Sequence, residues 1–260
     1  MTHIFAIANQ KGGVGKTTTA VNLAASLAAT KRRVLLIDLD PQGNATMGCG
    51  VDKYEIERSM YDVLVSNCSA GQALTSAPEA NFDVLPANGD LTAAEVELME
   101  VTGREQKLNN ALKALLPEYD YILIDCPPSL NMLTLNALVA AQGILIPMQC
   151  EYYALEGLSA LMQTITSIQS GPNPQLEITG LIRTMYDPRN SLTVDVSTQL
   201  ISHFGDRVYG TVIPRNVRLA EAPSYGMPVL NYDKSSRGAV AYLALAGEMN
   251  RRLGQTAQTK

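Results

Sequence analysis

The residues with the clearest chemistry lie near the start of the chain, in the segment KGGVGKTT at residues 11–18. Its glycines accept backbone angles that are closed to residues with a Cβ, so successive N–H groups can turn toward one anion. Lys16 can bridge the β- and γ-phosphates of a nucleotide, and the Thr17 hydroxyl can ligate Mg²⁺. The segment therefore predicts a nucleotide-binding loop made of Lys11, Gly12, Gly13, Val14, Gly15, Lys16, Thr17 and Thr18.

The loop departs from the common phosphate-binding pattern at its start. The pattern G-x-x-x-x-G-K-[ST] requires glycine at position 10, where this chain has Gln10. The next residue is a second lysine, Lys11, in addition to Lys16. An ordinary glycine-rich turn is the alternative interpretation, but it does not explain why lysine and threonine occupy the phosphate and magnesium positions.

The flanking sequence supplies the elements that such a loop needs. A short apolar run at residues 4–8 precedes it, and a helical pattern rich in alanine and leucine follows at residues 19–29. Strand, glycine loop and helix together place the positive end of the helix dipole and its unpaired N–H groups against a phosphate.

Two other apolar runs end in acidic side chains. One leads into Asp38 and Asp40, and the other leads into Asp125. Continuous apolar runs are typical of parallel strands buried on both faces, and such strands carry functional groups at their C-terminal ends. We expect Asp40 to orient an attacking water or a magnesium-bound water, and Asp125 to join Thr17 around the metal. For Asp38, a structural and a functional role both stay open.

Strand-like runs alternate with helical patterns along the rest of the chain. The later strand-like runs lie at residues 82–86, 143–148, 178–182 and 208–213. This order predicts an α/β, P-loop NTPase-type three-layer fold with a mostly parallel central sheet flanked by helices. We expect a single domain over residues 1–260, with a last helix that ends near Leu253 and a polar tail at about 254–260.

Composition is ordinary for a soluble globular protein, with 46% hydrophobic and 17% charged residues. The sequence contains no apolar run of about 18 residues and no signal peptide, so we expect a cytoplasmic protein without a membrane partner. Its four cysteines lack C-x-x-C spacing. This favours buried free thiols over a zinc site or a disulfide framework.

Charge is distributed unevenly along the chain. The net charge is −5, yet residues 181–260 contain ten Lys and Arg against six Asp and Glu, whereas residues 1–180 contain ten against nineteen. A basic final third permits a face that binds a polyanion, although such asymmetry also arises by chance.

Six motifs together resemble the ParA/Soj branch of the deviant Walker A ATPases, which segregate plasmids and bacterial chromosomes. They are KGGVGKTT at 11–18, DLDPQGN at 38–44, DCPPS at 125–129, EYYALEG at 151–157, VIPRNVR at 212–218 and LAEAPS at 219–224. The resemblance covers nearly the whole chain and implies an ATPase that uses ATP and Mg²⁺. It also implies an ATP-bound homodimer with slow hydrolysis that a partner stimulates.

The resemblance also assigns roles to single residues. In this family the early lysine, here Lys11, reaches across an ATP-sandwiched dimer and neutralises charge that develops on the other subunit's phosphates. Lys11, Lys16 and Asp40 are thus the expected catalytic residues, and the expected metal shell is Thr17, Asp40 and Asp125. The remaining expected contacts are Lys11, Gly12 and Glu151 at the dimer interface and Pro214 and Asn216 beside adenine.

For DNA, the family uses basic residues that the ATP-bound dimer exposes. The candidates are Arg189 and Arg218, in matching loops, together with Arg215, Lys234 and Arg237. A solvated surface charge is the alternative for each of them. Contacts of this kind ignore base sequence and weaken with salt. The implied partners are nonspecific double-stranded DNA and a ParB/Spo0J-like centromere-binding protein, and the implied location is nucleoid-associated.

Three other functions share parts of the pattern. A MinD-like membrane ATPase would need a C-terminal amphipathic helix, and residues 251–260 are too polar for one. A nitrogenase-type reductase would need paired cluster cysteines, which the spacing does not offer. An ATPase that positions chemoreceptors or cellulose synthase would keep every motif, so it stays open. Because the chain starts directly at a strand, we expect no N-terminal helix-turn-helix and no operator-specific repression.

Overall fold

The computed structural model describes residues 2–152 and 154–258, and within them the strands form one eight-stranded sheet. The strand order is β3-β4-β2-β5-β1-β6-β7-β8, and all neighbours are parallel except the edge pair β3 and β4. The expected mostly parallel sheet is confirmed. The strands are β1 (His3–Ile7), β2 (Val34–Asp38), β3 (Thr75–Ser76), β4 (Asp83–Leu85), β5 (Tyr121–Asp125), β6 (Gly143–Gln149), β7 (Glu177–Tyr186) and β8 (Val208–Pro214).

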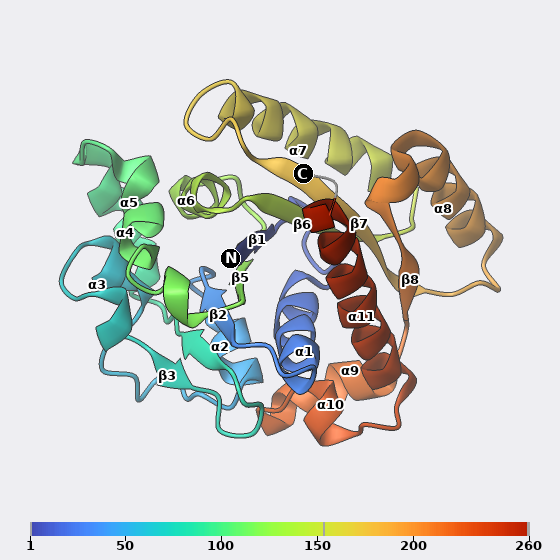
Figure 1. Cartoon of the computed structure of the whole chain (residues 1–260), viewed down its shortest axis with the longest axis horizontal. Coiled ribbons are helices and arrows are strands. Elements are labelled where there is room, and N and C mark those ends of the chain that lie inside the picture. The colour runs from blue at the N-terminus through green and yellow to red at the C-terminus, as the bar shows by residue number, and fades with distance from the viewer. Residues whose placement is uncertain (1, 153, 259–260) are drawn as a thin grey trace.

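Helices cover both faces of this sheet (Figure 1). One face carries α1 (Lys16–Ala29), α2 (Asn44–Gly48), α9 (Val217–Glu221), α10 (Val229–Tyr232) and α11 (Arg237–Gln258). The other face carries α3 (Met60–Leu64), α4 (Leu91–Glu97), α5 (Lys107–Leu112), α6 (Met132–Ala140), α7 (Ala154–Gln169) and α8 (Ser191–Phe204). Short 3₁₀ turns are η1 (Ala70–Gln72), η2 (Leu98–Glu100), η3 (Arg104–Gln106), η4 (Leu116–Glu118), η5 (Gly205–Arg207) and η6 (Ala222–Tyr225).

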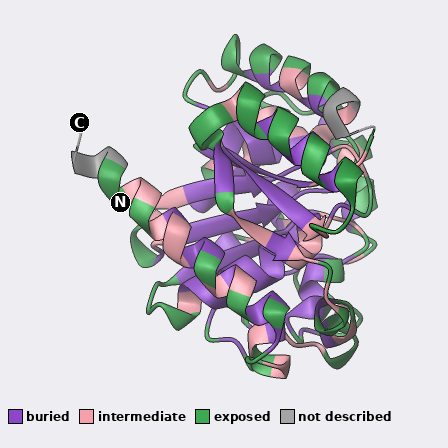
Figure 2. Cartoon of the chain, turned by 90° about the vertical axis from the view of Figure 1, so that its right-hand side faces the viewer, coloured by how far each residue is buried: buried purple, intermediate pink, exposed green. Residues whose placement is uncertain are grey.

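The central strands are largely apolar because both of their faces are covered. In β1, Ile4 and Ala6 belong to the core on one side, whereas Phe5 and Ile7 belong to the core on the other. Successive side chains of a strand point to opposite faces, so a strand between two helical layers needs apolar residues at every position. Figure 2 shows the result, with buried strands enclosed by helices that are exposed on their outer sides.

The three central strands end level with one another. Ile7 of β1 is paired with Asp125 of β5, and Asp125 is paired with Asp38 of β2. This register brings the loop after β1 and the two strand-end acids to the same edge of the sheet.

The end of the chain differs from the expectation. Helix α11 continues past Gly254 to Gln258, so the expected helix end near Leu253 is wrong. One glycine costs a helix only about 1 kcal/mol relative to alanine, and the residues that follow tolerate helical geometry. No helix in the described part of the chain is both long and apolar enough to cross a membrane.

Candidate nucleotide site

The glycine loop joins the end of β1 to the start of α1. Gly15, directly before the helix, has φ 85° and ψ 31°, and Gly13 also has a positive φ. Only glycine adopts this left-handed geometry without strain, which accounts for its place in the motif. The loop thus presents the open N-terminus of a 14-residue helix at the carboxyl edge of the sheet.

Asn9 fixes the first half of the loop, and our reading of the sequence did not single it out. Its side-chain oxygen accepts a hydrogen bond from the Lys11 N–H at 3.0 Å, and its amide nitrogen donates to the Pro147 carbonyl of β6 at 2.8 Å. Asn9 is buried, so both of its polar ends are paired. A polar residue directly after an apolar strand is the one sequence signal that could have identified it.

Lys16 lies buried at the beginning of α1, and its ammonium donates to the Lys11 carbonyl at 3.3 Å. Burial lowers the pKa of Lys16, and the nearby Asp125 carboxylate acts in the opposite direction. The lysine is therefore already curled over the loop in which a phosphate would lie.

Asp125 is fully buried, and neither of its oxygens has a hydrogen-bond partner among the described residues. Burial, and next the Asp38 carboxylate, raise the pKa of Asp125 well above its usual range, whereas Thr17 and Lys16 act in the opposite direction. A buried carboxylate without partners is costly unless a cation or a proton meets it. This position fits a bound metal ion.

Asp38 has a structural explanation that the sequence left open. It accepts hydrogen bonds from the Thr46 N–H and hydroxyl, both at 2.8 Å, and from the Asp40 N–H at 3.0 Å. Burial raises the pKa of Asp38 to about 6, against the effect of these bonds. Asp38 therefore ties β2 to α2 and shapes the turn that carries the less buried Asp40.

Thr17 and Asp125 fit a magnesium ion, with Asp40 in the neighbouring turn. In the part of the chain that the structure describes, no group of three or more His, Cys, Asp or Glu side chains converges as a metal site. Mg²⁺ usually takes one or two carboxylates and completes its shell with water and substrate phosphates. A magnesium ion at this edge would therefore depend on water and nucleotide phosphates for most of its ligands.

A cavity of about 180 Å³ opens beside the loop. Its lining is largely apolar and includes Met185 from β7 and Pro214 and Asn216 from the end of β8. The side-chain oxygen of Asn216 is buried and has no hydrogen-bond partner among the residues that the structure describes. Thr184, also in the lining, donates to the Val14 carbonyl at 2.8 Å and so joins β7 to the loop. An apolar slot with an amide side chain in its lining suits a nucleobase.

The five basic candidates for DNA contacts are all exposed, but they are not equivalent. Arg189 is paired with Asp187 at 2.8 Å, and Arg218 is paired with Glu221 at 2.7 Å and Asp233 at 3.4 Å. Within the described residues, no ion pair is formed by Arg215, Lys234 or Arg237. These three follow β8, around the start of α9 and α11.

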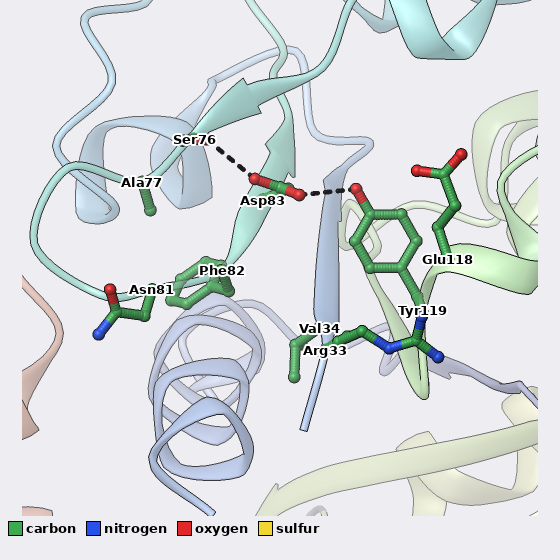
Figure 3. Close-up of a pocket in the computed structure, with 9 residues that line it drawn as sticks. All are labelled: Arg33, Val34, Ser76, Ala77, Asn81, Phe82, Asp83, Glu118 and Tyr119. Atoms are coloured by element: carbon green, nitrogen blue, oxygen red, sulfur yellow. Dashed lines mark hydrogen bonds between the residues drawn. The ribbon is translucent and has the colours of Figure 1, made fainter. Parts of the chain in front are cut away.

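A second cavity, of about 400 Å³, lies at the opposite, amino-terminal edge of the sheet (Figure 3). There Asp83 accepts hydrogen bonds from the Ser76 hydroxyl at 2.9 Å and from the Tyr119 hydroxyl at 2.7 Å. None of the side chains that line this cavity contributes a buried polar atom without a partner. The cavity is therefore complete without a ligand.

Comparison with known proteins agrees with this geometry. Residues 2–178 match the family described as AAA domain. The chain is 52% identical over 249 residues to the sporulation initiation inhibitor protein Soj of Bacillus subtilis, covering 96% of this chain and 98% of Soj. It is 51% identical over 248 residues to the chromosome partitioning protein ParA of Caulobacter vibrioides, covering 95% and 93% of the two chains.

A solved structure with the same fold contains the expected ligands. It is the cobyrinic acid a,c-diamide synthase of Mycobacterium smegmatis with bound ADP and magnesium, which matches with a TM-score of 0.86 and 38% identity over 98% of this chain and 96% of that one. The glycine loop, the acids at the strand ends and the identity to partitioning proteins all lead to one classification. The chain belongs to the ParA/Soj family of P-loop ATPases.

Proposed function

We propose that the chain is a DNA-partitioning ATPase that works as an ATP-bound dimer. One observation carries the nucleotide part of this proposal. At a single edge of the sheet, a glycine loop, a buried lysine and a buried carboxylate without partners lie beside an apolar slot. A nucleotide with a divalent cation satisfies each of these groups at once.

Each part of the site has a task in this proposal. The loop amides and Lys16 hold the β- and γ-phosphates, while Thr17 and Asp125 hold Mg²⁺, which neutralises phosphate charge when it is bound. Asp40 orients the attacking water. Lys11 supplies positive charge to the other subunit of the dimer.

We assign the selection of adenine to the side-chain amide of Asn216, which lines the slot. Adenine presents an amino group where guanine presents a carbonyl oxygen. Turned toward the base, the Asn216 oxygen accepts from the amino group but meets a carbonyl unfavourably. The slot therefore favours ATP over GTP.

Partitioning is preferred over the synthase activity because of the pattern of similarity. The chromosome partitioning protein ParA of Caulobacter vibrioides is 51% identical to this chain, whereas the protein named as a synthase is 38% identical. The basic residues after β7 and β8 add a surface for DNA phosphates, with Arg215, Lys234 and Arg237 better available than the paired Arg189 and Arg218. A ParB-like protein stimulates hydrolysis and releases the dimer from the nucleoid.

DNA binding measured in three nucleotide states tests this proposal. Binding of an arbitrary duplex is compared with ATP, with ADP and without nucleotide, at low and high salt, with and without the ParB-like protein. We expect DNA binding that requires ATP, does not depend on base sequence and weakens with salt. The ParB-like protein should shorten the lifetime of the complex with DNA. ATP hydrolysis without DNA binding in any state would retain the ATPase and exclude partitioning on DNA.

A further inference from the structure

Lys11 is held by an ion pair within its own chain. Its ammonium donates to Glu151 Oε2 at 2.8 Å. The two residues are 140 positions apart, and they meet because β1 and β6 are neighbours in the sheet. Their side chains are 37% and 46% exposed, so water reaches both ends of the pair.

The backbone of Lys11 is held separately from its side chain. Asn9 binds the Lys11 N–H and is itself tied to the Pro147 carbonyl of β6. The long side chain of Lys11 can therefore leave Glu151 by rotation about its own bonds while the loop stays in place. A half-exposed ion pair of this kind contributes little free energy and is easily exchanged.

This contact conflicts with the role proposed for Lys11 in the dimer. To reach the other subunit's phosphates, the ammonium must either leave Glu151 or bring the Glu151 carboxylate toward the triphosphate. If the ammonium leaves Glu151, the ion pair is lost. If the pair stays together, the negative Glu151 carboxylate is brought close to the negative triphosphate. In both cases Glu151 opposes closure of the dimer.

We propose that Glu151 is a latch that holds Lys11 in the single subunit and so restrains formation of the ATP-bound dimer. This proposal rests on the dimeric ATPase proposed above and adds a residue that sets its dimerisation equilibrium. Removing the charge of Glu151 should strengthen the dimer by up to about fivefold for each latch, and the two latches of a dimer multiply.

The test compares dimer dissociation constants by sedimentation of the full chain with Mg²⁺ and a slowly hydrolysed ATP analogue. Glu151→Gln keeps the shape of the side chain and removes its charge. Glu118→Gln removes the same charge at the opposite edge of the sheet, where Glu118 is exposed (Figure 3). We expect a tighter dimer for Glu151→Gln and an unchanged one for Glu118→Gln. The gain should shrink as salt is raised, because salt screens exposed pairs.

A double-mutant cycle shows whether Glu151 acts through Lys11. In a Lys11→Ala background, Glu151→Gln should bring no gain, because the latched residue is gone. If Glu151→Gln leaves the dimer unchanged or weakens it, the latch is wrong. The proposal of an ATP-bound dimer is retained in that case, provided that the wild type dimerises. If neither wild type nor Glu151→Gln dimerises with the ATP analogue, the dimeric ATPase itself is wrong, and the latch with it.

Discussion

The two cavities at opposite edges of the sheet differ in what their polar groups lack. In the larger one, the half-buried Asp83 carboxylate is paired with the Ser76 and Tyr119 hydroxyls. The smaller one, beside the glycine loop, is lined by Asn216. Among the described residues, neither the Asn216 oxygen nor the Asp125 carboxylate at the same edge has a hydrogen-bond partner. Of these two cavities, the smaller one is the candidate site although its volume is lower. A ligand at that edge can complete polar groups that the described residues leave unsatisfied.

The largest effect expected from this comparison is that of Lys16→Ala. Because the ammonium is buried over the loop and charged hydrogen bonds to phosphate are strong, ATP affinity should fall by at least about a hundredfold. Titration with a fluorescent ATP analogue measures it, with Lys113→Ala, an exposed lysine after α5, as the control. Normal ATP binding by Lys16→Ala would show that the glycine loop is not part of the nucleotide site.

Asp125→Asn distinguishes the contribution of Mg²⁺ to ATP affinity from that of the nucleotide itself. The change keeps the shape of the side chain but removes the charge that a cation would neutralise, so the gain in ATP affinity on adding Mg²⁺ should fall by about ten- to hundredfold. Binding is measured with Mg²⁺ and with EDTA. Asp83→Asn, at the edge where the carboxylate is already paired, should keep the full magnesium effect. If Mg²⁺ raises ATP affinity equally in both variants, Asp125 has no special role in metal binding, and the contrast between the two edges of the sheet is wrong.

Asn216→Leu tests the role proposed for the Asn216 amide in the lining of the slot. The preference for ATP over GTP should fall by about two- to tenfold, which corresponds to one hydrogen bond. Competition between the two nucleotides for the wild type and the variant measures it. An unchanged preference would mean that the base is recognised elsewhere.

The smallest effect belongs to the paired cavity. Tyr119→Phe removes one of the two hydroxyl donors to Asp83, so the free energy of unfolding should fall by about 0.5–1.5 kcal/mol while ATP affinity stays constant. Urea unfolding and ATP titration measure the two quantities. A change in ATP affinity would give this edge a role in nucleotide binding.

The sequence was sufficient where structure depends on local patterns. The glycine loop, the apolar strands and the acids at their ends follow from neighbouring residues, and so does the mostly parallel sheet. Contacts between distant residues were not predictable in this way. Neither the Lys11–Glu151 pair nor the bond from Asn9 to Pro147 leaves a local signal, because each depends on β1 lying next to β6.

The role of Asp38 and the end of α11 show the same limit at shorter range. Asp38 and Asp40 have the same residue type, and what distinguishes the structural acid is its full burial and its hydrogen bonds from Thr46. For α11, Gly254 reads as a stop signal, yet the helix that it would end is already packed on the sheet through residues such as Tyr242 and Met249. Tertiary packing outweighs such local preferences.

The hydrogen bond from Thr184 to the Val14 carbonyl has a thermodynamic consequence. One end of this bond belongs to the nucleotide loop, and the other lies three residues before Asp187, the partner of Arg189. If ATP changes the affinity of this region for DNA by some factor, DNA must change the affinity for ATP by the same factor. If that factor is favourable, DNA would act as an effector that raises the affinity of the protein for ATP.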